Sequence, residues 1–159
     1  WPPGFRLLLR GHANAPDVQR AVAAAAAEGI RSGRIALEPM VAPGDVVARA
    51  NAAAIGVFLP DIGLRQNRHA LPNKLFEYLW AGIVPVVPAA TDMADLLARH
   101  DAGLALAGDA ASALPGLLAG LTAERIMAEK QRAHRAAAAI HARAHEAGIV
   151  AAIARPLRG

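Results

Sequence analysis

The sequence predicts an α/β fold in which helices cover both faces of a parallel sheet, giving three layers. Short apolar segments alternate with helical segments along the chain, an order typical of parallel strands joined by helical crossovers. Most of the apolar segments do not alternate with polar residues, as expected for strands buried on both faces. The chain has 159 residues, which suits a single domain, and we expect residues 1–159 to form one domain without an internal linker.

The first third of the chain is predicted to contain three strands and two helices. Both helices have an acidic residue near their start, and the first ends at Gly29, where a glycine is a usual stop signal. The strands are short apolar runs between these helices. In chain order, the predicted elements are the strand Phe5–Leu9, the helix Asp17–Gly29, the strand Arg34–Leu37, the helix Gly44–Ala53 and the strand Ala54–Leu59.

The rest of the chain continues the alternation and then becomes helical. Thr91 is expected to cap a helix whose first turn is acidic, and Pro115 is expected to break the helix in which it lies. The tail 149–159 is expected to be a short helix or coil. The predicted elements are Lys74–Ala81, Thr91–His100, Ala111–Leu121 and the long alanine-rich Thr122–Ala147 as helices, with Val84–Val87 and Gly103–Ala107 as strands.

Composition excludes several classes of function. Cysteine is absent, so disulfide scaffolds, thiolate zinc sites and cysteine nucleophiles are ruled out. The net charge of +4 is spread without a dense basic block, and an ordinary basic surface in solvent is the better interpretation. As a ligand signal, it favours anionic small molecules or an anionic membrane surface over nucleic acid. No apolar run is long enough to cross a bilayer. The opening residues 1–4 are typical of a loop, so we expect the chain to be part of a longer protein.

The segment Leu71–Pro88 is the most informative part of the sequence. A turn at Pro72 and Asn73 starts a short helix, which stops at Gly82, and a buried strand follows. Lys74 lies in the first turn, where the positive end of the helix dipole disfavours a cation. A lysine placed against this rule indicates a bound anion, and helix N-termini attract phosphate through free amide groups. The segment therefore predicts a ligand that carries phosphate.

Glu77, three positions after Lys74, is the sharpest candidate for a second ligand contact. It lies away from the apolar face formed by Leu75, Phe76 and Leu79. It could accept hydrogen bonds from ligand hydroxyls, such as a ribose diol. It could equally be one half of an ion pair with Lys74 or a solvated helix acid, since such surface pairs are common and weak.

Three loops are expected to converge beyond the carboxyl ends of the strands, where parallel sheets bind their ligands. They are Arg10–His12, Met40–Pro43 and Pro60–Pro72. In the last loop, Arg68 reads as a phosphate partner or a solvated charge, as does Lys74 just after the loop. His69 reads as a ligand contact, a proton donor or neither. Gly11 would let a ligand approach the backbone, or is an ordinary turn glycine.

Other catalytic and metal motifs are missing. His141 and His145 have the spacing of a helical metal pair, but no acid lies between them, and His134 is too distant for the same ion. A solvated helix face is the better interpretation, and we expect no metal site. Neither serine lies in a nucleophile elbow, and no glycine-rich dinucleotide fingerprint or P-loop occurs.

The stretch Leu71–Val87 resembles the C-terminal donor-binding domain of bacterial group 1 glycosyltransferases, which have the GT-B fold with two Rossmann-like halves. The flanking segments fit the same pattern, so the resemblance extends from Phe5 to about Leu121. It implies a three-layer Rossmann-like domain, followed by C-terminal helices. The implied activity is transfer of a sugar from a nucleotide-diphosphate sugar to an acceptor. The implied substrate is the nucleotide sugar, with no cofactor and no metal.

The resemblance also assigns roles to individual residues. Glu77 matches the glutamate that hydrogen-bonds the ribose hydroxyls, Leu71–Lys74 matches the segment that meets the diphosphate, and the loop at Val41 would border the base. It implies an enzyme of cell-envelope polysaccharide synthesis in the cytoplasm, with peripheral attachment to the inner face of the membrane as a compatible location. The implied donor-binding residues are Gly11, Val41, Arg68, His69, Leu71, Pro72, Asn73, Lys74 and Glu77.

Two departures from the family pattern affect the expected function. His69 stands where the family often has a second glutamate, which leaves the donor sugar open. The acceptor-binding half and the first strand and helix of the donor half are not in these 159 residues, so we expect the fragment alone to be catalytically incomplete. A sugar-nucleotide epimerase with the same fold and a non-catalytic nucleotide-binding module remain alternatives, whereas an NAD-binding domain is disfavoured because the glycine fingerprint is missing.

Overall fold

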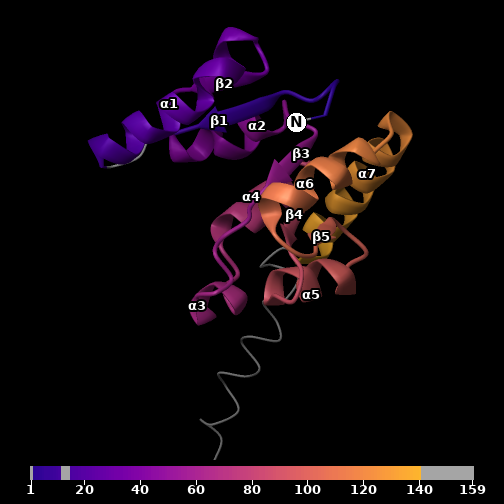
Figure 1. The fold of residues 1–159 in the computed structure, drawn as a ribbon. Coiled ribbons are helices and arrows are strands. Elements are labelled where there is room, and N and C mark those ends of the chain that lie inside the picture. The colour runs from indigo at the N-terminus through magenta and orange to yellow at the C-terminus, as the bar shows by residue number, and fades with distance from the viewer. Residues whose placement is uncertain (1, 12–14, 141–159) are drawn as a thin grey trace, which may run out of the picture. The chain divides into compact units, whose positions relative to one another are not determined.

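The computed structural model of the chain describes residues 2–11 and 15–140. These residues belong to two compact units, which divide between Val46 and Val47. Each unit contains parallel strands and helices, so the chain has an α/β fold that is consistent with a Rossmann-like arrangement (Figure 1). Within the described residues, no helix combines the length and the apolar character that a membrane span requires.

Unit 1 is built around two parallel strands and one long helix. Strand β1 (Leu7–Arg10) pairs with β2 (Ile35–Glu38), and helix α1 (Pro16–Arg31) connects them. The helix packs closely on β2, because a Cβ atom at Gly29 would lie 2.4 Å from the Ile35 side chain. A short 3₁₀ helix, η1 (Pro43–Asp45), follows β2 and runs into α2 (Val46–Ala50), where the sequence predicts one continuous helix.

Unit 2 contains a three-stranded parallel sheet in the order β3-β4-β5. Its strands are β3 (Ile55–Val57), β4 (Val84–Pro88) and β5 (Leu104–Leu106). All five residues of the central strand β4 are buried, as the unbroken apolar pattern predicts. The helices that lie wholly within this unit are α3 (Arg65–Arg68), α4 (Asn73–Trp80), α5 (Asp92–Arg99), α6 (Ala110–Ala119) and α7 (Ala123–Ile140).

One hydrophobic core joins α4, α5 and α7 to the sheet. Leu75 and Leu79 of α4 are fully buried, as is Met93 of α5. The side of α7 that faces α4 carries small residues, among them Ala133 and Ala136, which let the two helices approach closely. The apolar stripe predicted for α4 is therefore confirmed, and it holds the N-terminus of α4 at a defined place beside the sheet.

Several expectations from the sequence are corrected by the structure. Helix α6 continues through Pro115 without a break. The proline removes only one backbone hydrogen-bond donor of the helix. The helix start is stabilised by Asp109, whose carboxylate accepts a hydrogen bond of 3.0 Å from the Ser112 amide. The described strands form two small sheets rather than one. Helix α3 is an additional element inside the loop 60–72. The predicted extension of α7 to residue 147, His141, His145 and the tail 149–159 lie outside the described residues.

Candidate functional site

The predicted phosphate site lies where α4 begins, at the carboxyl edge of the sheet in unit 2. Because β3 and β4 are parallel, the helix that connects them starts at this edge. Pro72 precedes the helix in an extended conformation, without a side-chain cap, so the amides of Asn73 and Lys74 are donors that an anion could use. The exposed Leu71 leads into this turn. The segment Leu71–Lys74 thus has the local geometry that the sequence predicts.

One of the two alternative interpretations of Glu77 is an ion pair with Lys74, and this pair is not formed in the described chain. Lys74 is exposed and Glu77 is half-buried. Within the described residues, neither side chain has a hydrogen-bond or ion-pair partner. An uncompensated acid one turn inside a helix and an uncompensated cation at its tip are both available to a ligand.

Tyr78 attaches this part of α4 to β3. Its ring packs on Gly56, where an added Cβ atom would lie 2.5 Å from the ring, and its hydroxyl donates to the Val57 carbonyl oxygen at 3.3 Å. Burial raises the pKa of Tyr78 above its ordinary value of 10.0, and the negative charge of Glu77 raises it further. This contact could not be predicted from the sequence, because a glycine in a strand is ambiguous by itself.

The raised pKa of Tyr78 predicts a specific alkaline behaviour. Below about pH 10 the neutral phenol contributes its full stability, which is lost as the pH rises through the higher pKa of the folded state. Tyr78 is the one tyrosine in the sequence, so the ultraviolet absorbance of phenolate measures the ionisation of this residue alone. We expect the native protein to ionise at higher pH than the urea-unfolded protein, and Glu77→Gln to reduce the difference. Coincident titrations would contradict the packing described.

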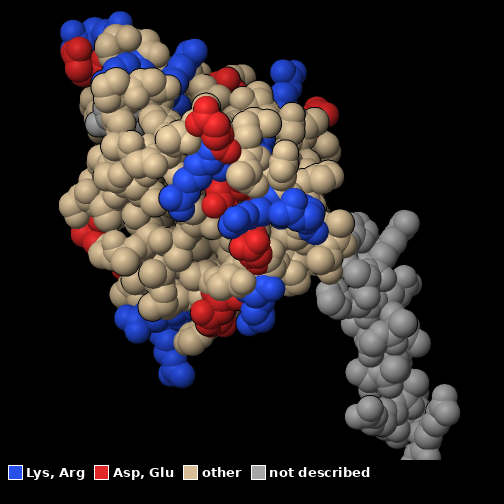
Figure 2. Space-filling model, turned by 90° about the vertical axis from the view of Figure 1, so that its right-hand side faces the viewer, with Lys and Arg blue, Asp and Glu red and all other residues tan. Residues whose placement is uncertain are grey.

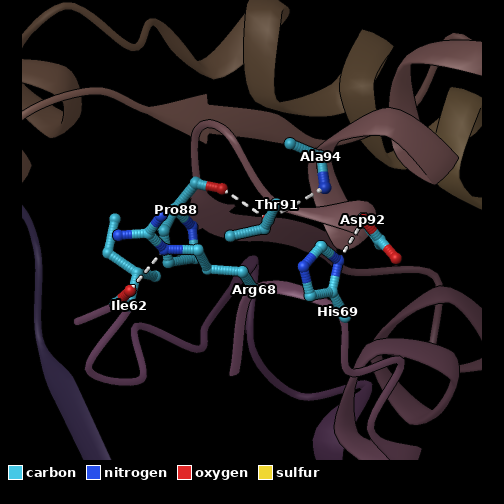
Figure 3. Close-up of polar contacts among 7 residues, drawn as sticks. All are labelled: Ile62, Arg68, His69, Pro88, Thr91, Asp92 and Ala94. Atoms are coloured by element: carbon cyan, nitrogen blue, oxygen red, sulfur yellow. Dashed lines mark hydrogen bonds and ion pairs between the residues drawn. The ribbon is translucent and has the colours of Figure 1, made fainter. Parts of the chain in front are cut away.

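The loop that precedes α4 is held by its own hydrogen bonds. The Asp61 carboxylate accepts from the Gly63 amide at 2.8 Å, and Asn67 donates to the Asp61 carbonyl oxygen at 2.8 Å. The Nε of Arg68 donates to the Ile62 carbonyl oxygen at 2.6 Å (Figure 3). Its terminal guanidinium nitrogens have no acceptor within the described residues. The guanidinium of Arg68 is therefore held through Nε, and its terminal nitrogens can still contact an anion.

His69 contacts an acidic residue in the first turn of α5. Its Nδ1 lies 3.3 Å from Oδ1 of Asp92, in the first turn of α5 (Figure 3). Thr91 caps this helix as predicted, because its Oγ1 accepts from the Ala94 amide at 3.3 Å and donates to the Pro88 carbonyl oxygen at 2.8 Å. The contact shows that the loop 60–72 reaches the end of β4. Parallel topology could have suggested this pairing, since both segments leave the same sheet edge.

Gly11 and Val41 belong to unit 1, whereas the other predicted site residues belong to unit 2. Gly11 follows β1 with a φ of +118°, and this backbone conformation alone explains why a glycine occurs here. Val41 is half-buried between β2 and η1. At the ends of the two strands, Arg10 and Glu38 form an ion pair. The convergence of all three loops on one ligand stays a prediction, and His12 lies outside the described residues.

Unit 2 also has a surface hollow that contains none of the predicted site residues. It has a volume of about 450 Å³ and lies where α7 passes the C-terminal end of α4. On the face of the molecule shown in Figure 2, cationic and anionic side chains are interspersed. The described residues contain no group of three or more histidine, aspartate or glutamate side chains that could hold a metal ion. The hollow is lined by Gly82, Met127, Lys130, Gln131, His134 and Arg135.

Comparison of this chain with models of known protein families gives no match, and comparison with curated protein sequences gives no significant match.

Proposed function

We propose that this chain is the donor-binding part of a glycosyltransferase with the GT-B fold and that it binds a nucleotide-diphosphate sugar. The observation that carries the proposal is the unpaired state of Lys74 and Glu77, at the tip and one turn inside a helix that starts at the carboxyl edge of a parallel sheet. The segment Leu71–Val87, which contains both residues, supports the same function. Transfer itself requires an acceptor-binding half in the longer protein.

The proposed mechanism is electrostatic. When the bond between the anomeric carbon and the diphosphate oxygen breaks, the electron pair stays on that oxygen and the negative charge of the diphosphate grows. Lys74, Arg68 and the first amides of α4 stabilise this charge. The amides are held in place by the helix and Arg68 by its hydrogen bond to Ile62 before the reaction begins. Glu77 holds the nucleoside by accepting hydrogen bonds from its ribose hydroxyls.

Glu77 should contribute mainly to nucleotide affinity. We expect Glu77→Ala to weaken binding of a nucleoside diphosphate about tenfold or more, because hydrogen bonds to a charged group contribute about 1.5–3 kcal/mol. Glu77→Gln keeps the size of the side chain and should give a smaller loss. Isothermal titration calorimetry with uridine, adenosine and guanosine diphosphates and their sugar conjugates measures both effects.

The matched control is Asp95→Ala, which removes an exposed carboxylate from the first turn of α5. We expect this variant to bind nucleotide as the wild type does. Equal affinity of the wild type and Glu77→Ala for every nucleotide tested would contradict the role assigned to Glu77.

A further inference from the structure

The contact between His69 and Asp92 joins two segments that are each fixed on their own. Helix α5 is anchored by Thr91, which is 3% exposed and bonded on both sides. The loop before His69 is anchored by the hydrogen bond from Arg68 to Ile62. Because both supports are in place, the imidazole and the carboxylate are presented to each other across the carboxyl edge of the sheet (Figure 3).

Stability does not explain this pair. The side chains of His69 and Asp92 are 61% and 50% exposed, and exposed ion pairs contribute only about 0.2–1 kcal/mol. Asp92 is favourable near the start of α5 in any case, but Asp95 lies in the same turn and forms no hydrogen bond or ion pair with His69. The specific contact is better explained by what it does to the imidazole ring.

A carboxylate at one ring nitrogen determines what the other nitrogen can do. With Nδ1–H donated to Asp92, the ring is held in one orientation and the opposite nitrogen, Nε2, faces away from the carboxylate. Nε2 has no partner within the described residues. In the imidazolium form both nitrogens donate, so Asp92 takes one N–H and the second can be given to an anion.

The surroundings of His69 favour an anion as that partner. Arg68 precedes it, and Lys74 is the second residue of α4, both without an ion-pair partner in the described part of the chain. We propose that Asp92 is a positioning residue that orients His69, so that Nε2–H donates a hydrogen bond to the diphosphate of the nucleotide-sugar donor. This inference rests on the proposed function. It adds a residue of α5, Asp92, which acts on the donor indirectly, by orienting His69.

The first test is affinity for a nucleoside diphosphate, measured by calorimetry on the intact protein. We expect His69→Ala to weaken binding about tenfold, the usual loss for one charge-assisted hydrogen bond, and Asp92→Ala to weaken it about threefold. Asp92→Asn should restore most of the affinity, because the amide oxygen still accepts Nδ1–H. Asp95→Ala, which changes the same helix turn, should bind like the wild type.

A double-mutant cycle separates positioning from a direct effect. If Asp92 acts through His69, the variant with both alanines should bind as weakly as His69→Ala alone. Independent losses that multiply would overturn the positioning role. Thermal unfolding of each variant confirms that it is folded, which the exposure of both side chains leads us to expect.

Nitrogen NMR of the histidine rings tests for direct contact with the ligand, because a purely structural role of His69 would not change its Nε2 resonance when nucleotide is added. Addition of nucleoside diphosphate should shift the Nε2 resonance of His69 and leave that of the exposed His134 on α7 unchanged. If Glu77→Ala weakens nucleotide binding while His69→Ala does not and the His69 resonance stays still, this inference fails and the proposed function stands. If the wild-type protein binds no nucleotide, both fail.

Discussion

Truncation of Leu79 to alanine is expected to lower the free energy of unfolding of unit 2 by about 2–5 kcal/mol. Leu79 is fully buried in the cluster that joins α4, α5 and α7. Its removal deletes apolar contacts and leaves a cavity that fixed neighbours cannot fill. Domains of this size are stable by about 5–15 kcal/mol, so the loss is large and should appear as a lower midpoint of urea unfolding.

Leu64→Ala provides a matched control for this loss. The chemical change is the same, but Leu64 is 52% exposed on the loop before α4, so we expect a change within about 0.5 kcal/mol. Leu79→Val, which removes less volume, should fall between the control and Leu79→Ala. Equal midpoints for Leu79→Ala and Leu64→Ala would show that α4 does not pack on the sheet as described.

Replacement of Lys74 is expected to slow sugar transfer much more than it weakens binding. In a protein that combines this chain with the acceptor-binding half that the proposed function requires, we expect Lys74→Ala to lower kcat about 100-fold, comparable to the loss of one preorganised donor that stabilises a developing negative charge. Donor affinity should change less, because the charge on the diphosphate increases only as the bond breaks. Steady-state kinetics with product analysis measures kcat and identifies the transferred sugar.

Arg125→Ala is the control for loss of a positive charge. Arg125 is an exposed residue of α7, and its removal should leave kcat unchanged. Lys74→Arg keeps the charge with a different shape and should retain part of the rate. A Lys74→Ala enzyme with wild-type kcat and a raised KM would instead show that Lys74 binds the donor equally well in the ground state and the transition state, which would contradict its expected role.

Most elements of the fold could be predicted because their signals are local. The buried strands lack alternation, α4 carries an apolar stripe, and Thr91 is a strong capping residue. The prediction that the helix breaks at Pro115 was wrong, because the cap and the other backbone hydrogen bonds of the helix can stabilise it although one donor is missing. The division of the strands into two sheets depends on pairing between distant segments, which local patterns do not encode.

The candidate site divides in the same way. Lys74 could be singled out because a cation at a helix start violates a local electrostatic preference. The sequence alone left the Lys74–Glu77 ion pair open, and the structure shows that it is not formed in the described chain. Asp92 and Tyr78 were missed as site residues because their partners, His69 and Gly56, are distant in sequence and meet them only through the fold.

The most direct test of the account is a crystal structure of the protein with a bound nucleotide-diphosphate sugar. We predict that the diphosphate contacts the amides of Asn73 and Lys74, while the Glu77 carboxylate lies within 3.2 Å, roughly the limit of a hydrogen bond, of a ribose hydroxyl. A nucleotide bound in another part of the chain, with the start of α4 occupied by water alone, would contradict the central claim.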